Sequence, residues 1–178
     1  VDVYGLDFAG GALDMIKAMP HVGDVVPGDD EERVTRLLTL IGSIVDERAS
    51  RYSKVRASDL TFYRKISGKK DEPRLLLLVD GIGAFSEEYQ STTAKARLWT
   101  RFQQILLDGR AVGVHVAVTA DRTQAIPTSL ASNFQRKIVL RMTDEESYLN
   151  LSLPKDVLTP TSPPGRAMQV GNPNVLQL

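Results

Sequence analysis

Hydrophobic residues occur along this chain in two kinds of pattern. Short β-branched and leucine-rich runs predict strands near residues 3–6, 25–26, 75–79, 114–119 and 136–142. Apolar residues three and four positions apart predict helices from 31 to about 51 and around 98–106, with shorter helices at 58–63 and 144–151. The polar stretch "GAFSEEYQSTTAK", residues 83–95, is expected to be an exposed connection.

The tail "PPGRAMQVGNPNVLQL" predicts a hairpin of two strands around a "GNPN" turn. Strands that alternate with helices favour an α/β fold with a mostly parallel sheet flanked by helices. The hairpin would add an antiparallel edge at the carboxyl end.

Composition narrows the classes of function. The 178 residues are 42% hydrophobic and 25% charged, which is typical of one globular domain. Lysine plus arginine equals aspartate plus glutamate at 22 each, so the chain lacks the positive field that drives non-specific DNA binding. The absence of cysteine and the presence of only two histidines argue against a structural zinc site. No apolar run approaches the ~20 residues that span a bilayer.

Polar residues follow several predicted strands. Asp7 and Asp80 end two of them, and Thr119 ends a third, followed by Asp121 and Arg122. Strand ends often become polar simply because they reach solvent. The carboxyl ends of parallel strands nevertheless share one edge of a sheet, where α/β proteins bind ligands. Asp7, Asp80 and Thr119 are therefore predicted to lie together.

Several short sequence motifs, taken in their order along the chain, indicate a family. "YGLDFAGGALDMIKAMPHV", "DERASRYSKVRASDLTFYR", "PRLLLLVDG", "GRAVGVHVAVTADR" and "PPGRAMQVG" resemble the FtsK/SpoIIIE family of ring-forming P-loop ATPases. Within it they are most similar to degenerate modules of the EccC-type motors of type VII secretion and of related actinobacterial proteins. The resemblance covers nearly the whole chain and implies a RecA-like P-loop NTPase fold that uses ATP and Mg²⁺.

The same resemblance implies roles for individual residues. Asp80 occupies the Walker B position and would hold Mg²⁺, and Thr119, Asp121 and Arg122 would contribute to nucleotide binding. The alternative for Asp121 and Arg122 is that they cap the turn that follows them. Gly81 stands where the family carries the glutamate that polarises the attacking water, so no catalytic residue is assigned and hydrolysis is expected to be slow. Glu87 and Glu88 could replace that glutamate only if the segment after Gly81 folded back.

No G-x-x-x-x-G-K-[ST] motif is present. In the family this phosphate-binding loop precedes the first strand seen here, so residues 1–178 are interpreted as the carboxyl-side portion of a single ATPase module. The alternative is that the loop was lost. The predicted function is a degenerate ATPase-family module with weak or regulatory nucleotide binding. The alternatives are an active DNA translocase motor or a protein-interaction domain that binds no nucleotide.

The implied partners are neighbouring ATPase modules and a secreted protein substrate, with DNA less favoured. The resemblance also implies a cytoplasmic location, at the membrane through the rest of the parent protein. Tyr89, Trp99 and Phe102 could form a surface for a peptide, but the helical spacing of Trp99 and Phe102 favours a place in the core.

Overall fold

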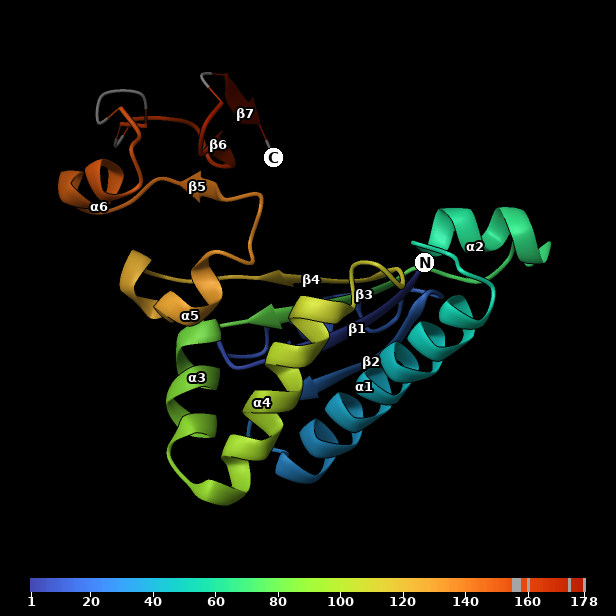
Figure 1. Ribbon diagram of the computed structural model, residues 1–178. Coiled ribbons are helices and arrows are strands. Elements are labelled where there is room, and N and C mark those ends of the chain that lie inside the picture. The colour runs from blue at the N-terminus through green and yellow to red at the C-terminus, as the bar shows by residue number, and fades with distance from the viewer. Residues whose placement is uncertain (155–157, 160, 173, 178) are drawn as a thin grey trace. The chain divides into compact units, whose positions relative to one another are not determined.

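The computed structural model describes residues 1–154, 158–159, 161–172 and 174–177 (Figure 1). The contacts within the chain divide it into two compact units, 1–120 and 121–178. Each unit has its own sheet, and each is described by itself.

A four-stranded parallel sheet forms the centre of the first unit. Its strand order is β2-β1-β3-β4, and every neighbouring pair is parallel. The strands are β1 (Asp2–Asp7), β2 (Val22–Pro27), β3 (Leu75–Asp80) and β4 (Val114–Val118). The predicted α/β class with a mostly parallel sheet is therefore confirmed.

Helices connect these strands. They are the 3₁₀ helix η1 (Ala12–Ile16) and the α-helices α1 (Glu31–Lys54), α2 (Leu60–Ser67), α3 (Ile82–Gln90) and α4 (Thr93–Asp108). Helices α1, α3 and α4 lie on one face of the parallel sheet (Figure 1).

The predicted helix that starts at residue 31 is confirmed as α1, which continues to Lys54. It begins there because the Asp30 side chain accepts a hydrogen bond from the backbone N–H of Arg33 at 3.1 Å, and Glu31 and Glu32 complement the helix dipole. Its apolar stripe is buried, as the spacing required.

The expectation of an exposed connection at 83–95 is wrong. Residues 82–90 form α3, in which Ile82, Phe85 and Tyr89 are fully buried. These three residues have helical spacing, but the serine and two glutamates between them made the segment look polar. The ring of Phe85 lies 5.1 Å from that of Phe102, centroid to centroid, so α3 is held to α4 by aromatic packing.

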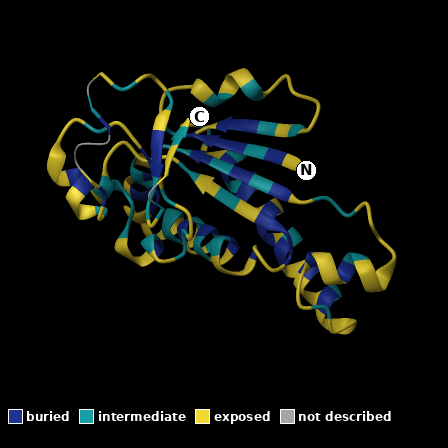
Figure 2. Cartoon of the chain, turned by 90° about the horizontal axis from the view of Figure 1, so that it is seen from above, coloured by how far each residue is buried: buried dark blue, intermediate teal, exposed yellow. Residues whose placement is uncertain are grey.

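Burial alternates along β3 and β4, and Figure 2 colours each residue by its burial. In β3, Leu75, Leu77 and Val79 are buried, whereas the residues between them are only half-buried. Trp99 and Phe102 are also buried, so the prediction that they belong to the core is confirmed.

The second unit contains a small antiparallel sheet of order β5-β6-β7. Its elements are η2 (Thr123–Ala125), α5 (Thr128–Ala131), β5 (Ile138–Leu140), α6 (Glu145–Asn150), β6 (Arg166–Gln169) and β7 (Val175–Gln177). The predicted carboxyl-terminal hairpin is confirmed as β6 and β7, although Pro173 in its turn and Leu178 lie outside the described residues. In the described chain it pairs with β5, in a sheet separate from the parallel one.

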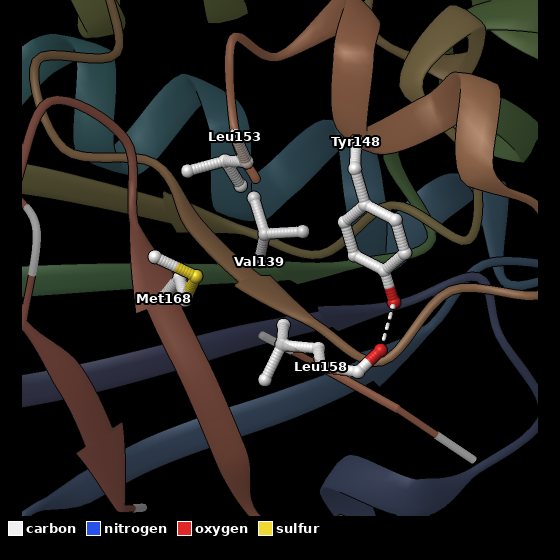
Figure 3. Close-up of a cluster of buried hydrophobic side chains, with 5 residues drawn as sticks. All are labelled: Val139, Tyr148, Leu153, Leu158 and Met168. Atoms are coloured by element: carbon white, nitrogen blue, oxygen red, sulfur yellow. Dashed lines mark hydrogen bonds between the residues drawn. The ribbon is translucent and has the colours of Figure 1, made fainter. Parts of the chain in front are cut away.

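A separate hydrophobic cluster stabilises the second unit. Figure 3 shows its five side chains, Val139, Tyr148, Leu153, Leu158 and Met168, all of which are buried. The Tyr148 hydroxyl lies 3.5 Å from the carbonyl oxygen of Leu158, which gives the only polar group of the cluster a partner.

Candidate functional site

Three predicted residues meet at the carboxyl edge of the parallel sheet. Asp7 and Asp80 are directly opposite each other in the register of β1 and β3. Thr119 follows β4, and its hydroxyl donates a hydrogen bond to Oδ1 of Asp80. The prediction that these residues lie together is confirmed.

Thr119 fixes the turn that follows β3. Its hydroxyl oxygen accepts a hydrogen bond from the backbone N–H of Gly81 at 3.0 Å, and its carbonyl accepts one from Ile82 at 3.0 Å. Its own N–H donates to the carbonyl of Val79 at 3.0 Å. Because both backbone and side chain take part, Thr119 sets the direction of the Asp80 carboxylate.

The second oxygen of Asp80 is available. Among the described residues, none donates a hydrogen bond to Oδ2, and the residue is only half-buried. Its backbone carbonyl accepts a hydrogen bond from the N–H of Phe8 at 2.9 Å, which ties the end of β3 to the loop that follows β1. Asp80 is therefore a fixed carboxylate with one oxygen free to bind a ligand.

The Asp7 carboxylate is hydrogen-bonded to the loop that follows β1. It is 6% exposed, and its carboxylate accepts hydrogen bonds from the backbone N–H groups of Ala9 at 3.1 Å, Gly11 at 2.9 Å and Leu13 at 2.9 Å. Burial acts to raise the pKa of the Asp7 carboxyl, but these N–H groups and that of Gly10 outweigh it and leave the pKa below its ordinary value. Asp7 thus stabilises the loop, and its carboxylate is not available to bind a metal ion.

Gly81 has a conformation that favours glycine. Its φ is +79°, and a Cβ built on it would lie 3.1 Å from the carbonyl carbon of Phe8 and 3.2 Å from the Cβ of Ala9. This geometry gives a backbone reason for glycine at the position where the family resemblance expects a catalytic glutamate.

Neither nearby glutamate replaces that carboxylate through a folded-back loop, because both belong to α3. Glu88 lies seven residues after Gly81, about 10 Å further along the helix axis. Its carboxylate forms an ion pair with Nζ of Lys95 at 2.6 Å.

Asp121 and Arg122 begin the second compact unit. Their side chains are largely exposed, and Nε of Arg122 lies 4.0 Å from Oδ1 of Asp121. The carbonyl of Arg122 accepts the N–H of Ala125 at 3.2 Å at the start of η2. Their roles in nucleotide binding stay predictions.

The chemistry of the donors at this edge suits Mg²⁺. The ion prefers oxygen ligands and commonly binds through one or two carboxylates together with substrate phosphates. Asp80 and Thr119 supply a carboxylate and a hydroxyl. In the part of the chain that the structure describes, no group of three His, Cys, Asp or Glu residues could hold a metal ion. A metal here would therefore take most of its ligands from water or from the oxygens of a phosphate ligand.

Sequence reasoning missed two features of this edge: the cage of N–H groups around Asp7 and the left-handed conformation of Gly81. Both had a local signal. An aspartate followed within four residues by Gly10 and Gly11 is typical of a carboxylate that accepts backbone N–H groups from a tight loop. A glycine between a strand and a helix is typical of a positive φ.

The fold is similar to that of ATPase domains of known structure. The structure superposes on that of Thermomonospora curvata EccC (ATPases 2 and 3) in complex with a signal sequence peptide, with a TM-score of 0.79 and 21% sequence identity over 96% of this chain and 30% of that one. At this identity the similarity shows the fold alone.

The sequence comparison shows the family. Residues 1–162 match the profile of the FtsK/SpoIIIE family, and the chain belongs to that family. It is 27% identical over 167 residues to the ESX secretion system protein YukB of Bacillus subtilis, spanning 93% of this chain and 11% of YukB. It is 24% identical over 154 residues to the type VII secretion system protein EssC of Staphylococcus aureus, spanning 84% of this chain and 10% of EssC. The chain thus covers about a tenth of these relatives, and the resemblance to type VII secretion motors is confirmed.

Proposed function

We propose that residues 1–178 are the carboxyl-side part of an ATPase module in a type VII secretion motor, and that Asp80 holds the Mg²⁺ of a bound nucleotide with help from Thr119. The observation that carries this proposal is the hydrogen bond between the Thr119 hydroxyl and Asp80 at the carboxyl edge of two adjacent parallel strands. This edge is where open α/β sheets bind ligands.

The phosphate-binding loop must come from outside these residues, because they contain no G-x-x-x-x-G-K-[ST] motif. Strand β4 offers a place for it. It is the last strand of the parallel sheet in the described chain, and Val116 and Val118 are only half-buried whereas Val114 is buried. A further parallel strand along β4 would cover these valines and bring a phosphate-binding loop next to Thr119.

In the completed module Asp80 would bind the ion through its free oxygen, and Thr119 would hold the carboxylate in place. The bound ion neutralises charge on the phosphate oxygens. Gly81 provides no group to orient the attacking water, so we expect slow hydrolysis and a regulatory use of nucleotide.

The partners in this proposal are neighbouring ATPase modules and a secreted protein. The complex of EccC with a signal sequence peptide supports the second of these. DNA is less favoured, because the positive and negative residues balance at 22 each. The module would act in the cytoplasm, next to the membrane through the rest of the parent protein. No helix among the described residues is long and apolar enough to cross a bilayer.

The test is nucleotide binding by the parent protein with and without Mg²⁺. We expect Asp80→Asn to remove the Mg²⁺ dependence of ATP affinity. Thr119→Val should weaken the affinity for Mg²⁺ by about 10- to 100-fold, as is usual for residues that orient a metal ligand. Asp108→Asn, a change to an exposed carboxylate at the end of α4, is the matched control.

Other outcomes separate the alternatives. ATP affinity that Asp80→Asn leaves unchanged would contradict the site. ATP turnover stimulated by double-stranded DNA would favour a DNA translocase instead. No nucleotide binding by the parent protein would favour a protein-interaction domain. Residues 1–178 alone are expected to hydrolyse no measurable ATP, because the backbone amides and lysine of a phosphate-binding loop are missing.

A further inference from the structure

Helix α2 exposes an apolar pair to solvent. Phe62 and Ile66 are 42% and 43% exposed and lie one turn apart on the same side of the helix. The helix is attached to the first unit by Leu60 and Tyr63, which are its buried residues. Tyr63 stacks on Tyr52 of α1 with ring centroids 4.1 Å apart. Phe62 and Ile66 are therefore not among the residues whose packing anchors α2.

Positively charged residues predominate near this pair in the sequence. Residues 54–72 contain six lysines and arginines and three carboxylates, Asp59, Asp71 and Glu72, whereas the two signs balance over the whole chain. Asp59 is occupied as the N-cap of α2, where it accepts the N–H of Phe62 at 2.8 Å. Arg64 donates hydrogen bonds to the carbonyl of Glu72. The other five cations are exposed: Lys54, Arg56, Lys65, Lys69 and Lys70.

These five cations have no carboxylate partner in the part of the chain that the structure describes. Glu72, whose side chain is 8% exposed, is already paired: one of its oxygens lies 3.1 Å from Nε of Arg48 and 2.6 Å from a terminal nitrogen of Arg51. The charges around α2 are therefore available to an external anionic surface. We call Phe62, Ile66 and the five cations the α2 surface.

We infer that the α2 surface binds anionic phospholipid bilayers, with Phe62 and Ile66 in the headgroup region and the five cations on lipid phosphates and carboxylates. Exposed apolar side chains on a helix, flanked by lysine and arginine, are what such binding requires.

A lipid surface fits these observations better than a protein partner does. Two apolar side chains are far fewer than a stable protein interface needs, since each partner buries about 800 Å². A peptide would need an apolar groove, but the hollow of about 340 Å³ near the carboxyl end of α1 has mostly charged walls, which include Arg51, Glu72 and Lys69 of the α2 surface. An outward-facing helix can instead rest on a flat bilayer.

This binding is independent of the proposed nucleotide site. Helix α2 leads into the amino end of β3, whereas Asp80 lies at the carboxyl end of the same strand. The two surfaces therefore lie at opposite ends of the sheet, and one can be removed by mutation without the other.

The experiment is co-sedimentation of the 178-residue chain with vesicles. At low salt we expect binding to vesicles of phosphatidylcholine with one third phosphatidylserine, none to phosphatidylcholine alone, and release at high salt. Lys65→Gln/Lys69→Gln/Lys70→Gln should weaken binding by about 100-fold, taking about fivefold per charge. Phe62→Ser/Ile66→Ser should weaken it by about tenfold.

Matched controls exclude a non-specific effect. Lys17→Gln/Arg97→Gln/Arg110→Gln removes the same number of charges elsewhere on the first unit, and Leu107→Ser removes an apolar side chain that is 60% exposed on α4. Both should bind as the unchanged chain does, and circular dichroism should show every variant to be folded. The inference is wrong if the chain ignores anionic vesicles, if it binds neutral ones equally, or if the control triple loses as much binding as the α2 triple.

Discussion

Asp7 and Asp80 occupy equivalent places at the ends of two adjacent parallel strands, yet their hydrogen bonds and exposure differ. Asp7 is buried and accepts three hydrogen bonds from backbone N–H groups of its own loop. Asp80 is half-buried, accepts one hydrogen bond at its carboxylate, from the Thr119 hydroxyl, and keeps its other oxygen open. The difference lies in the segment after each strand: a glycine-containing loop folds back over the first carboxylate, whereas a helix leads away from the second.

An acid at the end of a parallel strand is therefore a candidate ligand only if its own loop leaves it free. Asp7 shapes the loop, and Phe8 of that loop hydrogen-bonds to the carbonyl of Asp80 at 2.9 Å. The structural aspartate thus supports the one that we propose to be functional. Substitutions at this edge of the sheet can test this division of roles.

Substitution of Asp7 is expected to have the largest effect on stability. Asp7→Ala leaves three N–H groups of a partly buried loop without their charged acceptor, and we expect the free energy of unfolding to fall by about 3 kcal/mol. Urea unfolding of both proteins measures this. Asp14→Ala, at a carboxylate 72% exposed in the neighbouring η1, should change it by less than about 0.5 kcal/mol. Equal effects of the two changes would show that the cage around Asp7 does not stabilise the fold.

Acid pH gives a second measure of the same carboxylate. The pKa of Asp7 is lowered in the folded state, so its contribution to stability is present above the unfolded value near 3.8 and is lost as the pH falls through the folded pKa. Asp7→Asn should therefore flatten the loss of stability below pH 3.8. Some acid dependence should remain, because hydrogen bonds from the Phe62 backbone and the Ser58 hydroxyl also lower the pKa of Asp59. An unchanged acid limb in Asp7→Asn would contradict this assignment.

Gly81 should show the next effect. A left-handed backbone costs a residue with a Cβ about 1–2 kcal/mol, so Gly81→Ala should lower the free energy of unfolding by about that amount. Gly81→Glu should lose as much, and any gain in ATP hydrolysis by the parent protein would appear only per folded molecule. Full stability of Gly81→Ala would mean that the backbone does not require glycine, and a lost catalytic group would then be the better explanation.

The sequence predicted the parallel sheet, α1, the terminal hairpin and the meeting of Asp80 with Thr119, because each depends on a local pattern or on the geometry shared by all parallel sheets. It did not predict α3, whose buried apolar residues Ile82, Phe85 and Tyr89 are separated by small and polar ones. The sequence also did not reveal the positive φ of Gly81, because that angle depends on how the chain leaves β3. Gly81 was therefore interpreted only as a missing catalytic group.

Sequence reasoning grouped Asp7 with Asp80 because burial of a carboxylate is not visible in the residue type. Which acid is caged depends on whether a loop folds over it, and that is a property of the tertiary structure. The roles of Asp121 and Arg122 remain predictions for a related reason: they belong to the second compact unit rather than to the parallel sheet.

Thr119→Val should have a smaller effect than the changes at Asp7 and Gly81. Valine keeps the shape of threonine but removes the hydroxyl that joins Asp80 to the N–H of Gly81 at the exposed end of β4. We expect a loss of about 1 kcal/mol in the free energy of unfolding, measured with urea. Thr119→Ser keeps the hydroxyl and should recover most of it. A serine variant as unstable as the valine variant would show that the methyl group, and not the hydrogen bonds, matters.

Asp80→Asn should have the smallest effect on folding and the largest on ligand binding. Its side chain can still accept the hydrogen bond from Thr119, and no other residue in the described chain donates to its free oxygen, so the free energy of unfolding should change by less than about 0.5 kcal/mol. The variant loses the negative charge that a Mg²⁺ ligand needs, so the Mg²⁺ dependence of nucleotide affinity in the parent protein should disappear. Asp7→Asn gives the converse, with reduced stability but retained Mg²⁺ dependence in the fraction that folds. If both variants lost stability equally, or if Asp80→Asn kept its Mg²⁺ dependence, the two aspartates would not be divided between structure and function in the way their hydrogen bonds indicate.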